Sequence, residues 1–392
     1  MSNIKEDDTK LFPYNSRIVR LKDEDRFQVC LDLRRRRETT TETQTQTEED
    51  ELTQRVPRIG DVTAQFAVFD GHITNLAAKY AEKHWLECVL KATEKEKEET
   101  AKEKKRKGGS KPVLRETSSL EPSDAFGDAE DVLSEEIDFD LEKALIRATR
   151  DLEKGFKQHG LEEGDESVHG KSGCFGTCFG GKQKVPTGGT TVTSASIQRG
   201  LDTKEGDATF YIVCASCGDS GALLLPHPNE HDPDDREVNL RAHKRLTREH
   251  NADDPLEAVR LVQSGCRLGR MQRADGSEIG PLRAYPGGFA VSRAVGDFAV
   301  PGITCEPEVT RVKVPKTGAR LLVASDGVFA AISDGDISEI CATLSSSKEC
   351  ADKIIEKVLE LRGRHDDITL LIADIPPPEE YMKLFKATEI KD

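Results

Sequence analysis

Short apolar runs alternate with longer amphipathic stretches along the chain. The apolar runs predict strands at 62–69, 189–197, 209–217, 222–226, 320–325 and 368–375. Apolar residues at helical spacing predict helices that begin after Asn75, near Leu141 and after Asp254, with two more near 335–344 and 348–361. Because the strands alternate and pair locally while the helices occur in groups, we expect an antiparallel α+β domain built in layers.

The helix after Asp254 has the clearest boundaries. Asp254 is a favourable N-cap residue, Pro255 occupies the first helical position, and Glu257 follows three residues after the cap, as in a capping box. Gly265 closes the helix. These local signals predict both ends of the helix.

Three polar insertions interrupt the pattern, at about 34–58, 92–131 and 159–186, and a tail follows at 376–392. They hold too few apolar residues to offset the entropy of ordering, so we expect loops within one domain spanning 1–375. The Lys/Glu-rich run after Thr93 has an alternative, because i,i+4 charge pairs could extend the preceding helix. Its basic cluster at 104–107 (KKRK) resembles a nuclear localisation signal.

Composition narrows the functional classes. Hydrophobic residues make up 36% and charged residues 33% of the chain, which is typical of a soluble globular protein with polar insertions. The formal net charge of −15 disfavours a general nucleic-acid binder. No apolar run approaches the ~20 residues of a membrane helix, and the N-terminal residues lack a signal core. We therefore expect a cytoplasmic protein, with the nucleus as the alternative, that is monomeric and binds neither nucleic acid nor membrane.

The ten cysteines are scattered. Cys214 and Cys217 form a CxxC within a predicted strand, where buried structural thiols are common. Cys174 and Cys178 form a CxxxC in a glycine-rich stretch, where zinc binding is the alternative to a structural role.

Aspartates stand at the ends of several predicted strands. Asp70 and Asp326 each follow an apolar strand and precede a glycine, Asp219 follows another strand, and Asp366 precedes the last one. Turns explain one such aspartate, but four are harder to explain as turn residues. If they converge, shared protons or cations must relieve their repulsion. Oxygen ligands without nearby Cys or His favour Mg²⁺ or Mn²⁺, and two such ions about 4 Å apart can activate a water against a phosphoryl group.

Eight short motifs follow one another between about Arg17 and Asp374. They are, in order, RLKDED (20–25), FAVFDGH (66–72), GGTT (188–191), CGDS (217–220), LTREH (246–250), FAVSRAVGDF (289–298), ASDG (324–327) and HDDIT (365–369). Together they resemble the protein phosphatase 2C family of metal-dependent phosphatases. FAVFDGH and FAVSRAVGDF in this order are specific, whereas a lone DG or GDS carries no weight.

The resemblance implies a β-sandwich of two antiparallel sheets flanked by helices, with two Mg²⁺ or Mn²⁺ ions in a cleft at one end. Asp70 would bridge the two ions, Gly71 would bind through its carbonyl, and Glu24 would bind through water. The metal-binding residues that the resemblance implies are Glu24, Asp25, Asp70, Gly71, Asp219, Asp326 and Asp366.

Two further residues would take part in catalysis. Arg20 would bind the substrate phosphate, since its planar guanidinium pairs with two oxygens. His72 would protonate the leaving seryl oxygen. The alternatives are a surface arginine and a histidine at a helix start. The nucleophile would be water, so the cysteines need no catalytic role.

The chain departs from the family pattern at three places. Ile73-Thr74 follows DGH where small residues are usual, and Gly221 stands where an arginine commonly follows GDS. Ala330 replaces an aspartate that normally helps Asp219 hold a third, weaker ion. We therefore expect two ions and no well-occupied third.

The function favoured by the sequence is hydrolysis of phosphoserine and phosphothreonine in phosphoprotein substrates. One alternative is a weakly active pseudophosphatase that binds partners through its insertions. Another is a metal-dependent hydrolase of small phosphate esters.

Overall fold

The structure is a computed structural model of the chain. It describes residues 14–19, 22–30, 61–106, 140–163, 186–201, 208–227, 243–363 and 366–387. The predicted insertion at 34–58, most of the insertion at 92–131 and most of that at 159–186 lie outside the described residues.

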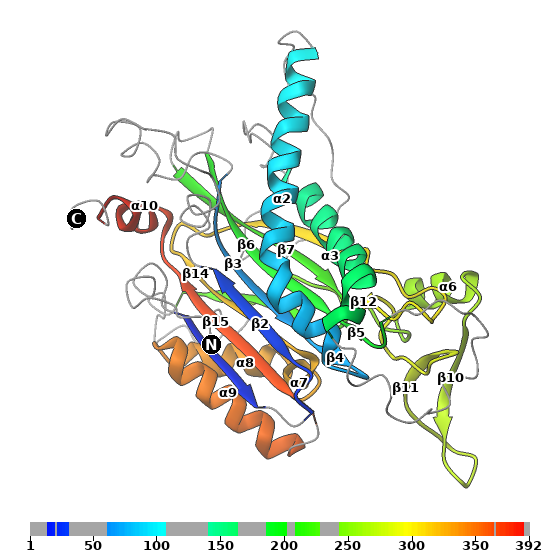
Figure 1. Ribbon diagram of the computed structural model, residues 1–392. Coiled ribbons are helices and arrows are strands. Elements are labelled where there is room, and N and C mark those ends of the chain that lie inside the picture. The colour runs from blue at the N-terminus through cyan, green and yellow to red at the C-terminus, as the bar shows by residue number, and fades with distance from the viewer. Residues whose placement is uncertain are drawn as a thin grey trace.

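Two five-stranded antiparallel sheets form the centre of the molecule (Figure 1). The first sheet has the order β1-β15-β14-β8-β9, with β1 (Tyr14–Val19), β8 (Gly221–Pro226), β9 (Lys244–Arg245), β14 (Ala319–Ala324) and β15 (Ile368–Ile375). The second has the order β13-β7-β6-β3-β2, with β2 (Arg26–Cys30), β3 (Val62–Phe69), β6 (Val192–Leu201), β7 (Ala208–Cys217) and β13 (Glu308–Lys313). The predicted α+β sandwich is confirmed.

Strand β3 shows why the central strands are apolar throughout. Phe66 and Val68 pack into the core between the sheets, while Ala67 and Phe69 pack on the opposite face against helices. Successive side chains of a strand point to opposite faces, so a strand covered on both faces loses its polar alternation. Phe69 meets the buried Trp85 edge-on, with ring centroids 6.5 Å apart.

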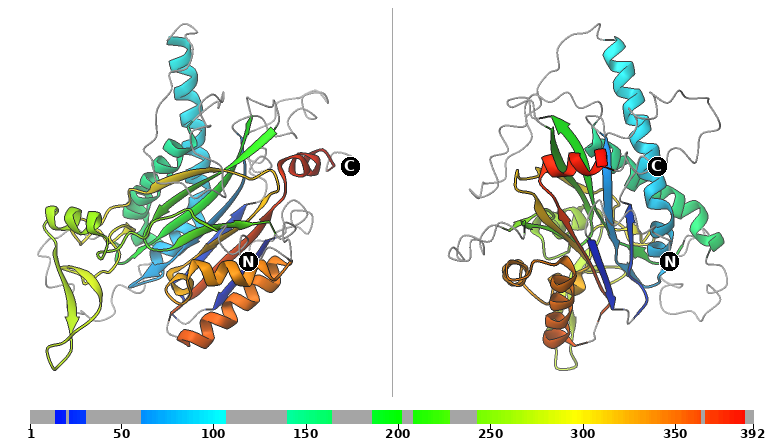
Figure 2. Two further views of the ribbon diagram at one scale, coloured as in Figure 1. Left: turned by 180° about the vertical axis from the view of Figure 1, so that it is seen from behind. Right: turned by 90° about the vertical axis from the view of Figure 1, so that its left-hand side faces the viewer.

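Helices cover both outer faces of the sandwich, which gives four layers (Figure 2). The second sheet is covered by α2 (Leu76–Arg106) and α3 (Leu141–Glu163). The first sheet packs against α7 (Asp326–Phe329), α8 (Asp334–Ala342) and α9 (Ser347–Arg362). Three very short strands form a small sheet of order β12-β5-β4: β4 (Gly71–His72), β5 (Gly189–Thr190) and β12 (Val295–Gly296).

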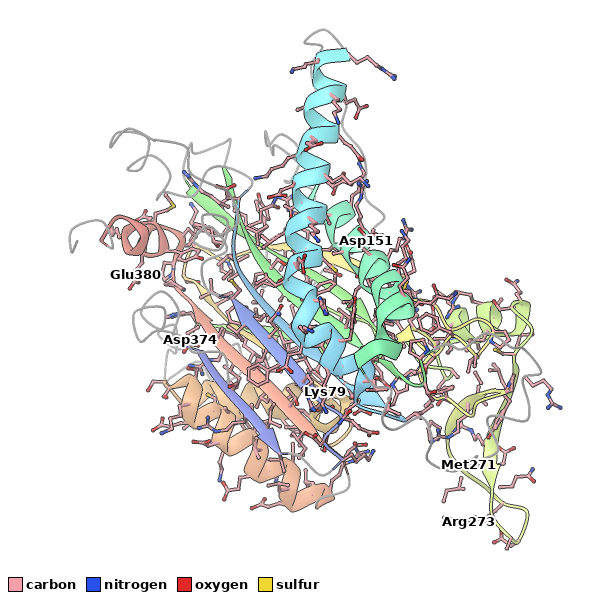
Figure 3. The ribbon with its side chains drawn as sticks, viewed as in Figure 1. Lys79, Asp151, Met271, Arg273, Asp374 and Glu380 are labelled. Carbon is pink, nitrogen blue, oxygen red and sulfur yellow. The ribbon has the colours of Figure 1, made fainter. Side chains whose placement is uncertain are left out.

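An arm, residues 255–285, projects from one side of the sandwich and holds α6 (Pro255–Gln263), β10 (Arg267–Gln272) and β11 (Glu278–Tyr285). In Figure 3, Met271 and Arg273 of its hairpin lie far from the layers. Asp254 caps α6 as predicted, accepting from the N–H groups of Leu256 and Glu257.

Glu257 does not complete the expected capping box. Its buried carboxylate accepts hydrogen bonds from Ser292 at 2.7 Å and from Arg293 at 2.6 Å. These contacts fasten α6 to the segment that follows the arm.

The expectation of a loop after Thr93 is wrong over residues 93–106, where the helical alternative is confirmed. Two contacts explain the extension. Glu96 is buried and pairs with Arg147 of α3 at 2.8 Å, and Arg147 also pairs with Glu99 at 2.9 Å. The final turns of α2 run past α3 (Figure 1).

The expectation of an unstructured tail after residue 375 is also wrong. Residues Pro378–Ala387 form α10, whose Tyr381 is fully buried. Its ring packs on Phe210 with centroids 4.4 Å apart, and its hydroxyl donates to Thr63 Oγ1 at 2.7 Å. The segment therefore belongs to the inter-sheet core. Within the described ranges, no helix has the length and apolar character needed to cross a membrane.

Candidate metal centre and acid–base pair

Three predicted aspartates converge at one end of the sandwich. Asp70 follows β3, Asp219 lies in the turn between β7 and β8, and Asp326 begins α7 directly after β14. One carboxylate oxygen of each lies within 4.8 Å of those of the other two. We call these three residues the acid cluster.

The strand register brings these acids together. β3 and β7 both pair antiparallel with β6, so their C-terminal ends share one edge. In the other sheet Ala324 pairs with Gly221 and with Leu370, which places the end of β14 beside the starts of β8 and β15. Val19 pairs with Ile368, so β1 also ends there. The same edge therefore carries the acid cluster and the loops that hold Glu24, Asp25 and Asp366.

Burial and mutual repulsion oppose the ionisation of all three carboxylates in the acid cluster. Burial, together with the charges of Asp25, Asp326 and Asp219, holds the pKa of Asp70 well above its ordinary value. Burial and the charge of Asp326 raise the pKa of Asp219 to about 7. Burial and the charge of Asp366 raise the pKa of Asp326. Carboxylates without nitrogen or sulfur ligands in their group suit Mg²⁺ or Mn²⁺, so the residues fit the cations that the resemblance implies.

A buried carboxylate organises the loop that follows β1. Asp367 accepts hydrogen bonds from the backbone N–H of Lys22 at 2.7 Å, of Glu24 at 2.7 Å and of Asp25 at 3.2 Å. Burial raises the pKa of Asp25 to about 7. The charges of Asp367 and Asp326 add to this effect. Asp367 is the second acid of the HDDIT motif, a position for which the sequence alone predicted no role.

The remaining predicted ligands lie around the acid cluster. The Asp366 carboxylate pairs with Lys22 Nζ at 2.8 Å, so the lysine ammonium offsets its charge. Glu24 is half-buried, and burial raises its pKa. A Cβ at Gly71 would lie 2.6 Å from the Glu24 backbone oxygen, so glycine at this position lets the two loops approach. Arg20 lies outside the described residues.

His72 has a partner that the sequence analysis missed. Its Nε2 lies 2.5 Å from Oδ2 of Asp297, whose side chain is buried. Burial alone would lower the pKa of His72, but the charge and hydrogen bond of Asp297 and the charges of Asp219 and Glu24 raise it. Asp297 therefore favours the imidazolium form. The motif FAVSRAVGDF contains Asp297, but the motif does not reveal which residue it contacts.

Glycines make room for Asp297. A Cβ at Gly189 would lie 2.5 Å from Asp297 Oδ2, and a Cβ at Gly296 would lie 2.5 Å from the Gly188 carbonyl oxygen. Asp297 itself has a left-handed backbone, with φ of 49°. The Gly296 N–H donates to Glu153 of α3 at 2.6 Å, which anchors this strained segment to a helix.

Comparison with known proteins decides the family. The protein phosphatase 2C family model matches residues 35–367, which is most of the chain. The chain belongs to the protein phosphatase 2C family. It is 30% identical over 333 residues to "Probable protein phosphatase 2C 5" of Arabidopsis thaliana, covering 83% of this chain and 57% of that protein. It is 33% identical over 204 residues to "Probable protein phosphatase 2C 3" of Oryza sativa subsp. japonica, covering 52% and 37%. The chain thus spans only part of the length of these relatives.

Solved structures show the same fold. A serine-threonine phosphatase 2C from Toxoplasma gondii superimposes with a TM-score of 0.56 at 17% identity, covering 93% of this chain and 95% of that one. A sex determining protein of C. elegans gives a TM-score of 0.54 at 20% identity, covering 95% and 67%. At these identities the likeness shows the phosphatase 2C fold alone.

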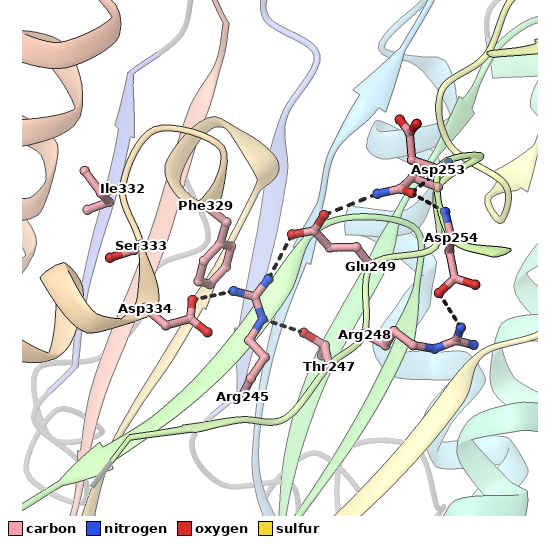
Figure 4. Close-up of a pocket in the computed structure, with 11 residues that line it drawn as sticks. Arg245, Thr247, Arg248, Glu249, Asp253, Asp254, Phe329, Ile332, Ser333 and Asp334 are labelled. Carbon is pink, nitrogen blue, oxygen red and sulfur yellow. Dashed lines mark hydrogen bonds and ion pairs between the residues drawn. The ribbon is translucent and has the colours of Figure 1, made fainter. Parts of the chain in front are cut away.

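Two departures from the phosphatase 2C pattern meet near the acid cluster. Ala330 caps the C-terminus of α7, and its N–H donates to the Asp326 carbonyl, so this position offers no carboxylate. Gly221 begins β8, two residues after Asp219. A pocket of about 540 Å³ lies next to both, lined by Arg245, Thr247, Arg248, Glu249, Asn251, Asp253, Asp254, Phe329, Ile332, Ser333 and Asp334 (Figure 4).

The CxxC of β7 is structural, as predicted. Cys214 packs into the core between the sheets and Cys217 into the core beneath α2 and α3, so the two thiols face opposite sides of one strand. Burial raises the pKa of Cys214 to about 12 and that of Cys217 well above its ordinary value. Neither is suited to metal binding or nucleophilic chemistry. Cys174 and Cys178 lie outside the described residues.

Proposed function

We propose that this member of the phosphatase 2C family is a metal-dependent serine/threonine phosphatase that acts on phosphoproteins. One observation supports this function most strongly. The acid cluster of Asp70, Asp219 and Asp326 lies at the same end of the sandwich as the His72–Asp297 pair. Carboxylates for cations and an imidazolium for the leaving group are the two components that hydrolysis of a phosphate monoester needs.

We assign two Mg²⁺ or Mn²⁺ ions to this end of the sandwich. Asp70, Asp326, Asp366 and the Gly71 carbonyl would hold them, and Asp219 would lie beside them in the same acid cluster. Glu24 would act through water, and Asp25 would support the same site. When bound, such ions lower the pKa of a water and offset the charge of the phosphoryl oxygens. Lys22 pairs with Oδ1 of Asp366 at 2.8 Å, so its ammonium offsets the charge of this carboxylate when no metal is bound.

His72 supplies the proton in this proposal. Asp297 holds Nε2, so the proton passes from Nδ1 to the seryl or threonyl oxygen as the bond to phosphorus breaks. The raised pKa of His72 favours the protonated ring. Arg20 is the proposed phosphate ligand, on the resemblance of RLKDED to the family motif.

An assay with a phosphothreonine peptide and with p-nitrophenyl phosphate, each in Mn²⁺ and in chelator, tests this function. We expect turnover of the peptide in Mn²⁺ and none in chelator. No turnover of either substrate at millimolar Mn²⁺ would favour the pseudophosphatase. Turnover of the small ester alone would favour the hydrolase of small esters.

A further inference from the structure

We propose that Arg245 is a positioning residue that holds the loops of Asp219 and Asp326 at a fixed separation and thereby sets the affinity of the acid cluster for divalent cations. The inference deepens the proposed function and rests on it, since it concerns the same metal centre. Arg245 ends the short edge strand β9 and lies in the pocket of Figure 4.

Arg245 joins three elements through its guanidinium. Its Cζ lies 3.7 Å from the centroid of the Phe329 ring. Its Nη1 donates to Asp334 Oδ1 at 2.7 Å, and its Nε donates to Thr247 Oγ1 at 3.3 Å. A planar guanidinium can stack on a ring and donate in its own plane at once, which an ammonium cannot do.

These contacts lead directly to the acid cluster. Phe329 is the last residue of the one-turn helix α7, whose first residue is Asp326. Thr247 Oγ1 accepts from the Ala222 N–H at 3.1 Å, which fixes the start of β8 just after the turn that carries Asp219. Arg245 therefore connects the backbone segments of two of the three acids.

Gly221 shows that the guanidinium needs this space. A Cβ there would lie 2.5 Å from Arg245 Nη2 and 2.8 Å from Phe329 Cε2. Gly221 does not have a positive φ, so its backbone conformation does not require glycine. Arg245 stands on the neighbouring strand β9, which pairs with β8.

Arg245 also pairs with an acid that lies near Asp219. Its Nη2 lies 3.6 Å from Glu249 Oε1, and the charge of Glu249 acts on Asp219. Without Arg245, Glu249 and Asp334 would lose the guanidinium with which both pair. The Phe329 ring would lose its stacking partner. Loosened loops would hold the carboxylates less accurately. Substitution of residues that orient metal ligands typically lowers metal affinity by about 10- to 100-fold.

The test measures Mn²⁺ binding directly, by electron paramagnetic resonance of free Mn²⁺ over the full chain. Arg245→Ala should weaken binding by about tenfold. Arg245→Lys should restore little of it, because an ammonium cannot stack and donate along the same directions. The KM for a phosphothreonine peptide, measured at saturating Mn²⁺, should stay unchanged. Arg248→Ala is the matched control, because Arg248 lines the same pocket but pairs with Asp254 and Glu308. It should bind Mn²⁺ like the parent protein.

Moving the arginine from β9 to β8 separates a positioning role from general damage to the fold. Gly221→Arg alone should lower the melting temperature, since the new side chain collides with Arg245. Gly221→Arg combined with Arg245→Ala should recover Mn²⁺ affinity relative to Arg245→Ala.

Two results would overturn the inference: Arg245→Ala that binds Mn²⁺ like the parent, or a double variant that binds no better than Arg245→Ala. A parent chain that binds Mn²⁺ without hydrolysing phosphopeptide would remove the proposed function but leave this inference intact.

Discussion

The surroundings of Asp70 strongly oppose its charge. Its folded pKa is raised well above the ordinary 3.8, so folding favours its protonated form. Metal-free protein therefore loses stability as pH rises from about 3.8 towards the raised pKa. Bound cations would remove this penalty. The same charge that destabilises the metal-free fold would thus hold the metals.

Asp70→Asn should separate these two effects. Turnover should fall at least about 100-fold, because even residues that only support metal ligands cost about 10- to 100-fold. The melting temperature of the metal-free variant should exceed that of the parent at neutral pH. The difference should shrink at about pH 4, where the side chain at position 70 is uncharged in both folded proteins. Calorimetry in chelator measures this difference. A metal-free variant that melts below the parent at neutral pH would contradict the account.

Asp297 should set the pH range of catalysis. A general acid must be protonated, so activity falls as pH rises through the pKa of His72, which Asp297 raises. In Asp297→Asn this alkaline limb should move to lower pH by about one to three units. A pH profile of kcat in saturating Mn²⁺ measures the shift. Asp275→Asn, on the exposed turn of the arm, is the control and should leave the limb in place. An unmoved limb in Asp297→Asn would reject the assigned partnership.

Single residues differ in how far the sequence predicts them. Asp70, Asp219 and Asp326 were predictable because each follows a strongly apolar strand. Asp297 and Asp367 were not, because their importance lies in their partners. Asp297 contacts a histidine 225 residues away, and Asp367 contacts backbone more than 340 residues away. Strand ends can be read locally, whereas such contacts depend on the completed fold.

Among the elements, α10 contributes Tyr381 to the core between the two sheets. Tyr381→Phe should cost about 1 kcal/mol, for the hydrogen bond to Thr63. Tyr381→Ala should cost about 3–5 kcal/mol, since it also leaves a cavity beside Phe210. Urea unfolding measures both changes. Glu380→Ala, on the exposed face of the same helix (Figure 3), should have little effect. Equal stability of the Tyr381→Ala and Glu380→Ala variants would show that α10 is not part of the core.

The elements predicted best are those buried on both faces. β3 and β15 match their predicted ranges because every position faces a core. β13 and the hairpin of β10 and β11 were missed, since most of their residues are partly or fully exposed and carry polar side chains. α10 was missed because its segment holds few apolar residues, while Tyr381 and Met382 within a short helix suffice to dock it. Tertiary contacts of a few residues decided these cases.

At the scale of the whole molecule, the sandwich brings distant loops to one edge. The ends of β1, β3, β7 and β14 and the start of β15 all meet there, from both sheets. Cations bound at this edge would therefore tie the two sheets together. The overall architecture and the acid cluster were predictable from ordered motifs, but the arm and the pocket around Arg245 were not.

Phosphatase activity should depend on metals that the acid cluster binds. The most direct test is to titrate Mn²⁺ into the parent chain and the Asp70→Asn variant, following bound Mn²⁺ and phosphate release from a phosphothreonine peptide in the same samples. We predict that in the parent both signals rise together and that chelator abolishes both, whereas the variant loses tight binding and turnover. Turnover that persists in chelator, or that is unchanged in the variant, would contradict the account.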